Sequence, residues 1–400
     1  MNTIIYLDNN ATTAVDPAVL EAMLPYLTTL YGNPSSMHAF GGQVGKSLRA
    51  AREQVADLLG ADPTEILFTS CGSEGNNAAI RAALQALPER KHIITTQVEH
   101  AAVLNVCKQL EKQGYRVTYL SVDKQGMLDL MELEAALTGD TALVSTMAAN
   151  NETGVLFPIE QIGALAKAYG AIFHVDAVQA VGKIPLNMAT STIDMLTLSG
   201  HKLHAPKGIG ALYIRRGVRF RPLLIGGHQE RGRRAGTENV AGIIALGKAA
   251  EIAHSHLQDD YEQQLRDRLE EGLLAQIPDC EVNGHPVQRL PNTSNLGFKY
   301  IEGEAILFWL NQHGICASSG SACTSGSLEP SHVLRAMGLP YTILHGSIRF
   351  SLSRFNSPAD IDQVLTVMPE VVAKLRAISP FNSDAEDWLQ GREQELALHR

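Results

Sequence analysis

The chain has 400 residues, of which 45% are hydrophobic and 19% are charged, as is typical of a globular protein with a large buried core. This length is enough for two or three domains. The formal net charge of −9 argues against nucleic acid or an anionic membrane surface as the main partner.

The first residues, MNTIIYLDNN, have no basic flank and no long apolar run, so they do not predict a signal peptide. The sequence also lacks a run of the roughly 18 apolar residues that a membrane-spanning helix needs. An odd, low number of cysteines in a long chain is typical of a reducing compartment, so we expect a cytoplasmic protein. The five cysteines are Cys71, Cys107, Cys280, Cys316 and Cys323.

Short apolar runs rich in β-branched residues alternate with helical patterns from about residue 50 to residue 250. Helices are predicted over 74–87 and 159–170. The alternation predicts an α/β fold in which a mostly parallel, seven-stranded sheet is covered by helices. The predicted strands are 65–70, 92–98, 115–122, 141–147, 171–176, 194–199 and 210–216.

A different pattern begins after about residue 255. A charged helix is predicted over 257–277, strands over 292–298 and 346–353, and a helix over 360–378. These elements indicate a second, smaller α/β domain.

The expected division of the chain follows from that change of pattern. We predict a large domain over residues 16–256 and a small domain formed by residues 1–15 and 257–382. Residues 383–400 are polar and are expected to form a solvated helix or a frayed tail.

Polar and ionisable residues follow five of the predicted strands. Ligands of open α/β sheets bind outside the carboxyl ends of the strands, so these side chains are expected to meet in one crevice. Each residue alone has an ordinary structural explanation, as a cap, a turn residue or a solvated charge. The residues concerned are Gly72, Ser73, Glu99, His100, Asn150, Asn151, Asp176, Gln179, Ser199, His201 and Lys202.

The chemistry of this set points to one cofactor. A helix that opens with Gly72 and Ser73 presents free N–H groups, which suit a phosphate. The Lys202 amine can condense with an aldehyde, and the Asp176 carboxylate can keep a pyridine nitrogen protonated. His100 can stack on an aromatic ring or transfer protons near it. Together these are the groups that a protein supplies for pyridoxal phosphate chemistry.

Long motifs of the chain resemble the cysteine desulfurases of the class-V aminotransferase superfamily. The resemblance covers about residues 4 to 380, and it implies the α/β fold of pyridoxal-phosphate-dependent aminotransferases. The matching motifs are YLDNNATT (6–13), YGNPSSMH (31–38), EHAAVL (99–104), HVDAVQAVGK (174–183), SGHKLHAPKGIGALYIR (199–215) and ASSGSACTSGSLEPSHVLRAMG (317–338).

The resemblance implies a role for each matching residue at the cofactor. Lys202 would attach the cofactor, Asp176 would pair with its ring nitrogen, Gln179 would contact the ring hydroxyl, and His100 would stack over the ring. Ser73 stands where the family usually has Thr, and either hydroxyl can donate. The residues implied to hold the phosphate are Gly72, Ser73, Ser199 and His201.

Further implied roles concern the substrate and a second subunit. Asn151 and Arg349 would bind the substrate α-carboxylate, and a guanidinium suits this role because it can hold a carboxylate with two hydrogen bonds. Taken alone, Arg349 could equally be a surface arginine on a strand. Thr237 would reach the phosphate bound by the partner subunit, which implies a homodimer.

Cys323 lies in the middle of SSGSACTSGS (318–327), a run of small residues that favours a flexible loop. By the resemblance, its thiolate would take the sulfur of L-cysteine as a persulfide, release alanine, and pass the sulfur to an acceptor protein. Because a free thiol has a pKa of roughly 8.5, a base is needed, and His100 is a candidate to accept the proton.

Three motifs suggest a subtype. FTSCGSEGNN (68–77), GGHQERGRRAGTEN (226–239) and SGSACTSGSLEPSHV (319–333) are similar to the form dedicated to nitrogenase maturation. The expected acceptor is therefore an iron–sulfur cluster assembly scaffold, in a nitrogen-fixation role. A selenocysteine lyase and the housekeeping iron–sulfur desulfurase remain alternatives.

Two other functions remain open as interpretations of the sequence. An aminotransferase would leave the thiol segment around Cys323 without a purpose. A non-catalytic scaffold would carry a cluster on its cysteines, but clusters need three or four thiolates at set spacing, and these five are scattered. Cys316 and Cys323 are seven residues apart, a poor match to a structural zinc site, so no metal is predicted.

Overall fold

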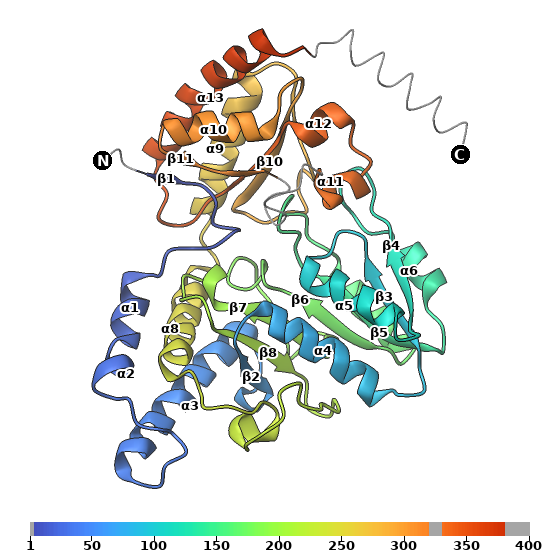
Figure 1. The fold of residues 1–400 in the computed structure, drawn as a ribbon, viewed down its shortest axis with the longest axis vertical. Helices are drawn as coiled ribbons and strands as arrows, with labels where there is room; N and C mark the ends of the chain where they lie inside the picture. The colour runs from blue at the N-terminus through green and yellow to red at the C-terminus, as the bar shows by residue number, and fades with distance from the viewer. Residues whose placement is uncertain (1–3, 320–329, 381–400) are drawn as a thin grey trace.

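A mixed sheet forms the centre of a computed structural model that describes residues 4–319 and 330–380 (Figure 1). Every pair of neighbouring strands in it is parallel except those made by β8, which runs antiparallel to both of its neighbours. The predicted mostly parallel sheet is therefore confirmed. Within the described residues its strand order is β2 (Ile66–Thr69), β8 (Gly210–Ile214), β7 (Met195–Ser199), β6 (Ile172–Asp176), β5 (Thr141–Met147), β3 (His92–Thr96) and β4 (Arg116–Leu120).

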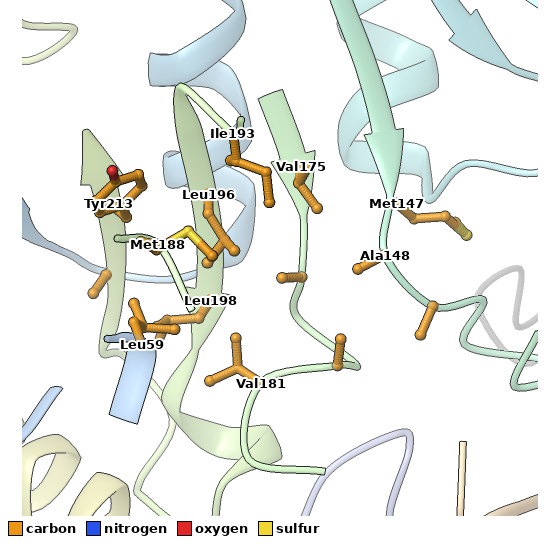
Figure 2. Packing of buried hydrophobic residues seen from close by; sticks show 14 of the residues in the cluster. Leu59, Met147, Ala148, Val175, Val181, Met188, Ile193, Leu196, Leu198 and Tyr213 are labelled. Atoms are coloured by element: carbon orange, nitrogen blue, oxygen red, sulfur yellow. The ribbon is translucent and has the colours of Figure 1, made fainter. Parts of the chain in front are cut away.

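Helices cover both faces of this sheet. The helices α4 (Gly72–Ala86) and α5 (Ala101–Glu111) pack on one face, and α3 (Ala39–Leu59), α7 (Ile159–Ala168) and α8 (Val240–His256) pack on the other. Because side chains alternate along a strand, β2 sends Leu67 to the first face and Ile66 and Phe68 to the second. Figure 2 shows the second face, where Leu59 lies near Leu198.

Small residues allow helices α3 and α8 to approach closely. A Cβ added at Gly247 would lie 2.6 Å from the Cα of Ala51, so a side chain there would push the helices apart. The short helix α1 (Pro17–Met23) also packs against α8. The elements α2 (Pro25–Thr28) and α6 (Leu130–Ala136) complete this part.

A second hydrophobic cluster lies apart from the large sheet, in the upper part of Figure 1. Among the residues that the structure describes, four strands make its sheet. Strand β1 (Ile5–Tyr6) pairs beside it with β11 (Ile315–Cys316), so the N-terminal strand lies in this part. The sheet order is β12 (Ser318–Ser319), β13 (Ser347–Ser351), β10 (Thr293–Phe298) and β9 (Cys280–Val282). Helices α9 (Tyr261–Gln276), α10 (Gly303–Gln312) and α13 (Pro358–Ile378) pack in this cluster. Helix α11 (His332–Ala336) instead packs in the core of the large sheet, and α12 (Tyr341–His345) contacts β10.

Four predicted helix boundaries are wrong by two residues or more. The charged helix expected over 257–277 begins at Tyr261, because the chain leaves helix α8 at His256 and the segment between holds Asp259 and Asp260, whose side chains favour caps and turns. Helices α4 and α13 begin two residues earlier than expected, at Gly72 and Pro358, and α7 ends two residues earlier, at Ala168. No helix among the described residues is long and apolar enough to cross a membrane.

Candidate active site

Ten of the predicted site residues line one cavity of about 360 Å³ at the carboxyl edge of the parallel strands. A cavity of this size is in the range of small-molecule sites. The convergence follows from the sheet, because parallel strands end at the same edge. The ten residues are Gly72, Ser73, His100, Asn151, Asp176, Gln179, Ser199, His201, Lys202 and Arg349.

The N-terminus of helix α4 forms one wall of this cavity. Because the helix begins at Gly72, that residue and Ser73 belong to its first turn, whose N–H groups have no partner within the helix. A Cβ at Gly72 would lie 2.8 Å from Cγ2 of Val178, so no larger residue fits without a shift. The wall is therefore a set of backbone donors at the cavity, which suits an anion.

A buried carboxylate forms the floor. Asp176 ends strand β6 and is 7% exposed. Its Oδ2 accepts a hydrogen bond of 2.6 Å from the amide of Asn76, and its Oδ1 accepts one of 3.1 Å from the N–H of Val178. Neither donor is charged, and the described residues form no ion pair with this carboxylate. A cationic N–H in the cavity would therefore give the Asp176 carboxylate a charged hydrogen-bond partner.

The amine of Lys202 reaches the cavity from the short 3₁₀ turn Gly200–Lys202 after strand β7. Its Nζ donates to the backbone carbonyl of Asn10 and, at 2.7 Å, to that of Ala11. The N-terminal segment thus crosses the sheet edge and holds this amine at the cavity.

His100 is the N-cap of helix α5, and its Nδ1 accepts the N–H of Ala102 at 3.1 Å. Because Nδ1 accepts, a neutral His100 ring carries its proton on Nε2. In this geometry the ring can donate from Nε2 and has no lone pair there to accept a thiol proton.

His201 and Ser199 lie beside the Lys202 turn. Burial and the nearby charges of Lys202 and Lys207 lower the pKa of His201 to about 4, so its ring is neutral at neutral pH. Its Nδ1 lies 3.2 Å from the hydroxyl of Thr12. Ser199 ends strand β7 and is buried, so its hydroxyl is shielded from bulk water.

A buried arginine faces the other end of the cavity. Arg349 lies on strand β13, its Nη2 pairs with Asp8 at 2.8 Å, and its Nη1 donates to the carbonyl of Asn151 at 2.9 Å. Its Nε is buried and has no hydrogen-bond partner among the described residues. A small carboxylate in the cavity would supply an acceptor for it.

Comparison with known proteins agrees with this geometry. The sequence pattern of the family described as aminotransferase class-V matches residues 5–364. The chain belongs to the class-V aminotransferases.

Among class-V aminotransferases, the chain is 78% identical to the cysteine desulfurase 2 of Trichormus variabilis, over 99% of this chain and 100% of that protein. It is 59% identical to the cysteine desulfurase NifS of Azotobacter vinelandii, over 96% and 97% of the two chains. A solved NifS-like protein aligns with a TM-score of 0.88 and 40% identity, over 93% of this chain and 100% of that one. The predicted resemblance to cysteine desulfurases is thereby confirmed.

Three described residues that were predicted for the site of this class-V aminotransferase do not line the cavity. Glu99 and Asn150 are buried beside it, where Glu99 accepts the N–H of Met147 and Asn150 donates to the carbonyl of Val98. Thr237 is exposed and lines a separate cavity with Ser70, Gly208 and Asn239. Cys323 lies outside the described residues. Burial raises the pKa of both Cys107 and Cys280 to about 12, so neither thiol is a ready nucleophile.

Sequence reasoning missed three polar residues that line the class-V cavity or contact its lining. Asn76 supports Asp176, while Asn10 and Lys183 contact Gln179. Asn10 lies in YLDNNATT and Lys183 ends HVDAVQAVGK. Both motifs carry the family resemblance, but the resemblance implies no role for these two residues. Asn76 lies one helical turn after Gly72, and this spacing on helix α4 is the signal that could have found it.

Proposed function

We propose that this chain is a pyridoxal-phosphate-dependent cysteine desulfurase, which removes sulfur from L-cysteine and leaves L-alanine. One observation carries the proposal: the Lys202 amine, the buried Asp176 carboxylate and the N-terminus of helix α4 line one cavity. Relatives that are 59% to 78% identical and are named cysteine desulfurases support the same reaction.

The donor set fits pyridoxal phosphate. The N–H groups at Gly72 and Ser73, with the side chains of Ser199 and His201, suit its phosphate. Asp176 lacks a cationic partner among the described residues and suits a protonated pyridine nitrogen. The amine of Lys202 suits the aldehyde.

When bound, this cofactor supplies an electron sink for the α-carbon of an amino acid. Side chains of the protein would hold the cofactor and transfer the protons. Asp176 would hold the proton on the ring nitrogen, and Gln179 would donate its amide N–H to the ring oxygen. Lys202 would remove the α-proton through Nζ, and His100 would stack over the ring with its Nε2 proton available for donation.

The substrate carboxylate would lie at Arg349. Its Nε is already buried without a partner among the described residues, while Asp8 and the carbonyl of Asn151 fix the other two nitrogens. The Asn151 side chain lines the same cavity and can add one N–H. Together they would orient cysteine with its α-carbon toward Lys202.

The sulfur step rests on sequence, since Cys323 lies outside the described residues. The Cys323 thiolate would attack the sulfur of the bound cysteine and form an S–S bond as the C–S bond breaks. The carbon keeps the electron pair of that bond and takes up a proton, giving alanine, and Cys323 is left as a persulfide. An iron–sulfur cluster scaffold would then accept the sulfur.

The name NifS of a 59% identical relative favours the nitrogenase-maturation subtype over the housekeeping form and the selenocysteine lyase. We further propose a homodimer in which Thr237 of the partner subunit contacts the phosphate. The exposure of Thr237 in a cavity of its own fits that arrangement.

The test measures alanine and sulfide formed from L-cysteine by the purified protein, together with its visible absorption band. Cys323→Ala and Cys323→Ser should keep the band and lose sulfide release, because the cofactor site is intact and the nucleophile is gone. Lys202→Ala should lose both. Normal sulfide release by both Cys323 variants would disprove the persulfide step.

The same preparation separates the alternatives. Faster turnover of L-selenocysteine than of L-cysteine would indicate a selenocysteine lyase, and amino transfer to a keto acid would indicate an aminotransferase. Iron in the purified protein, without a band that responds to cysteine, would indicate a cluster scaffold.

A further inference from the structure

Lys183 lies between two cavities and has no part in the function proposed above. A second cavity, of about 310 Å³, is lined by both Lys183 and Lys202, and Lys202 also lines the active-site cavity. Lys183 itself contacts Gln179 and Asn10, which line the active-site cavity.

A tight turn places Lys183 there. After strand β6 the chain winds through Ala177–Gly182, where the N–H groups of Ala180 and Val181 both donate to the carbonyl of Ala177. Gly182 has a φ of +75°, and a Cβ there would lie 2.4 Å from Cδ2 of Leu203, so glycine is required. The turn brings Lys183 back beside Gln179, four residues earlier.

The contacts of Lys183 fix which way two side-chain amides point. Its Nζ lies 3.0 Å from Oε1 of Gln179 and 3.3 Å from Oδ1 of Asn10. A lysine ammonium only donates, so it accepts the oxygen end of an amide and rejects the NH₂ end. Without it, the carbonyl of Asn10, which accepts from Nε2 of Gln179, would be the remaining contact among the described residues that favours this orientation.

The other end of the Gln179 amide is thereby turned toward Lys202. Its Nε2 donates at 2.9 Å to the carbonyl of Asn10, and Lys202 donates to the same carbonyl. Gln179 therefore presents nitrogen on the side where the Lys202 amine lies.

We propose that Lys183 is a positioning residue, which holds the Gln179 amide so that its NH₂ group faces the cofactor. This inference rests on the proposed function, because it needs pyridoxal phosphate in the cavity. Lys183 acts through Gln179 and does not touch the reacting atoms. The alternative is that Lys183 only stabilises the turn and the N-terminal segment.

A double-mutant cycle separates these two roles. Lys183→Met removes the donors at similar length, and it is made in the natural chain and in Gln179→Ala. The readouts are the affinity of each apoprotein for pyridoxal phosphate, the pH midpoint of the cofactor's visible band, and the melting temperature of the apoprotein. Burial lowers the pKa of Lys183 to about 7, and Glu262 opposes that shift, so affinities are measured at pH 6, where the amine is charged.

We expect Lys183→Met to weaken cofactor binding by about tenfold in the natural chain, the loss of roughly one hydrogen bond to a charged group. In the Gln179→Ala background it should change binding by less than about twofold. Lys207→Met removes an exposed charge near the site without touching Gln179, and it should leave the band midpoint unchanged.

An equal loss of affinity in both backgrounds, or an unchanged band midpoint in Lys183→Met, would overturn the inference. If Lys183→Met does not fold, Lys183→Gln replaces it, since a glutamine can donate or accept and so imposes no orientation. Absence of a cofactor band in the natural chain would overturn the proposed function, and this inference with it.

Discussion

Asn76 supports the carboxylate of Asp176, which we propose pairs with the ring nitrogen of the cofactor. Its amide nitrogen holds Asp176 at 2.6 Å, while its own Oδ1 is buried without a hydrogen-bond partner among the described residues. Burying an amide oxygen without a hydrogen bond costs free energy. The fold tolerates this cost at Asn76, which indicates that a fixed orientation of the Asp176 carboxylate matters more.

We predict that Asn76→Ala weakens pyridoxal phosphate binding by about tenfold, since one hydrogen bond to a charged group is lost. Titration of the apoprotein with the cofactor measures this. The neighbouring Asn77 is the matched control, because its side chain donates to the backbone of its own helix at Ser73. If Asn77→Ala has the same effect, Asn76 has no special role.

Glu99 gives a prediction about stability and pH. It is fully buried behind the site, where Thr96 and the N–H of Met147 donate to Oε1. Burial raises the pKa of Glu99 from 4.5 to about 8, and these two hydrogen bonds and the charge of Asp176 contribute smaller effects. A raised carboxyl pKa means that folding favours the protonated form, so stability is lost as pH rises from about 5 through 8.

Glu99→Gln should remove that loss, because glutamine keeps the shape and does not titrate. The free energy of unfolding of the variant, relative to the natural chain, should rise by on the order of 3 kcal/mol between pH 5 and pH 9. Urea unfolding at both pH values measures it. The difference between two pH values cancels any constant cost of burying the amide, and a difference that does not grow with pH would contradict the assignment.

The N-terminus of helix α4, more than any one side chain, forms the wall of backbone donors that we propose binds the phosphate. Gly72→Ala would place a Cβ 2.8 Å from Val178 and 3.6 Å from the Cβ of Ser199. We predict a loss of about 1–3 kcal/mol in stability from this crowding and weaker cofactor binding, since the donors shift. Gly45→Ala, in helix α3 with its nearest neighbours 3.7 Å away, should instead stabilise by about 0.5–1 kcal/mol. Thermal unfolding of the two variants tests both signs, and equal effects would argue against a special role of Gly72.

At the scale of helices and strands, the sequence predicted the features that depend on residues close together in the chain. Strands such as β5, which is rich in buried β-branched residues, were predicted by their composition, and residues after strand ends were placed by the topology of a parallel sheet. Asn10 could not be placed in this way, because its position depends on the pairing of β1 with β11, more than 300 residues apart in sequence. The break before Tyr261 was missed because the charged pattern continues across it.

At the scale of the whole molecule, the cavity is built by segments that are distant in sequence. The large sheet supplies Asp176 and Lys202, strand β13 of the other hydrophobic cluster supplies Arg349, and the N-terminal segment joins them through Asp8 and Asn10. Thr237 lies outside this cavity and lines a separate one. Its exposure leaves it available to a second copy of the chain.

A hybrid dimer tests whether Thr237 serves the other subunit. Thr237→Asp should abolish activity, because a carboxylate would repel the phosphate, and Lys202→Ala should abolish it by removing the amine. In a hybrid of the two variants, one site combines the natural Lys202 of one subunit with the natural Thr237 of the partner subunit. Co-expression with two different tags isolates this hybrid, and sulfide release should return to about half that of the natural dimer, since one of two equivalent sites is complete.

A Thr237 that serves its own subunit would give a different activity in the hybrid. If Thr237 served its own subunit, each site of the hybrid would carry one substitution, so the hybrid would be as inactive as its parents. If Thr237→Asp alone kept normal activity, the residue would have no contact with the phosphate in either subunit. Recovery near one half therefore requires both a dimer and a shared site, because neither a monomer nor a dimer with self-contained sites can produce it.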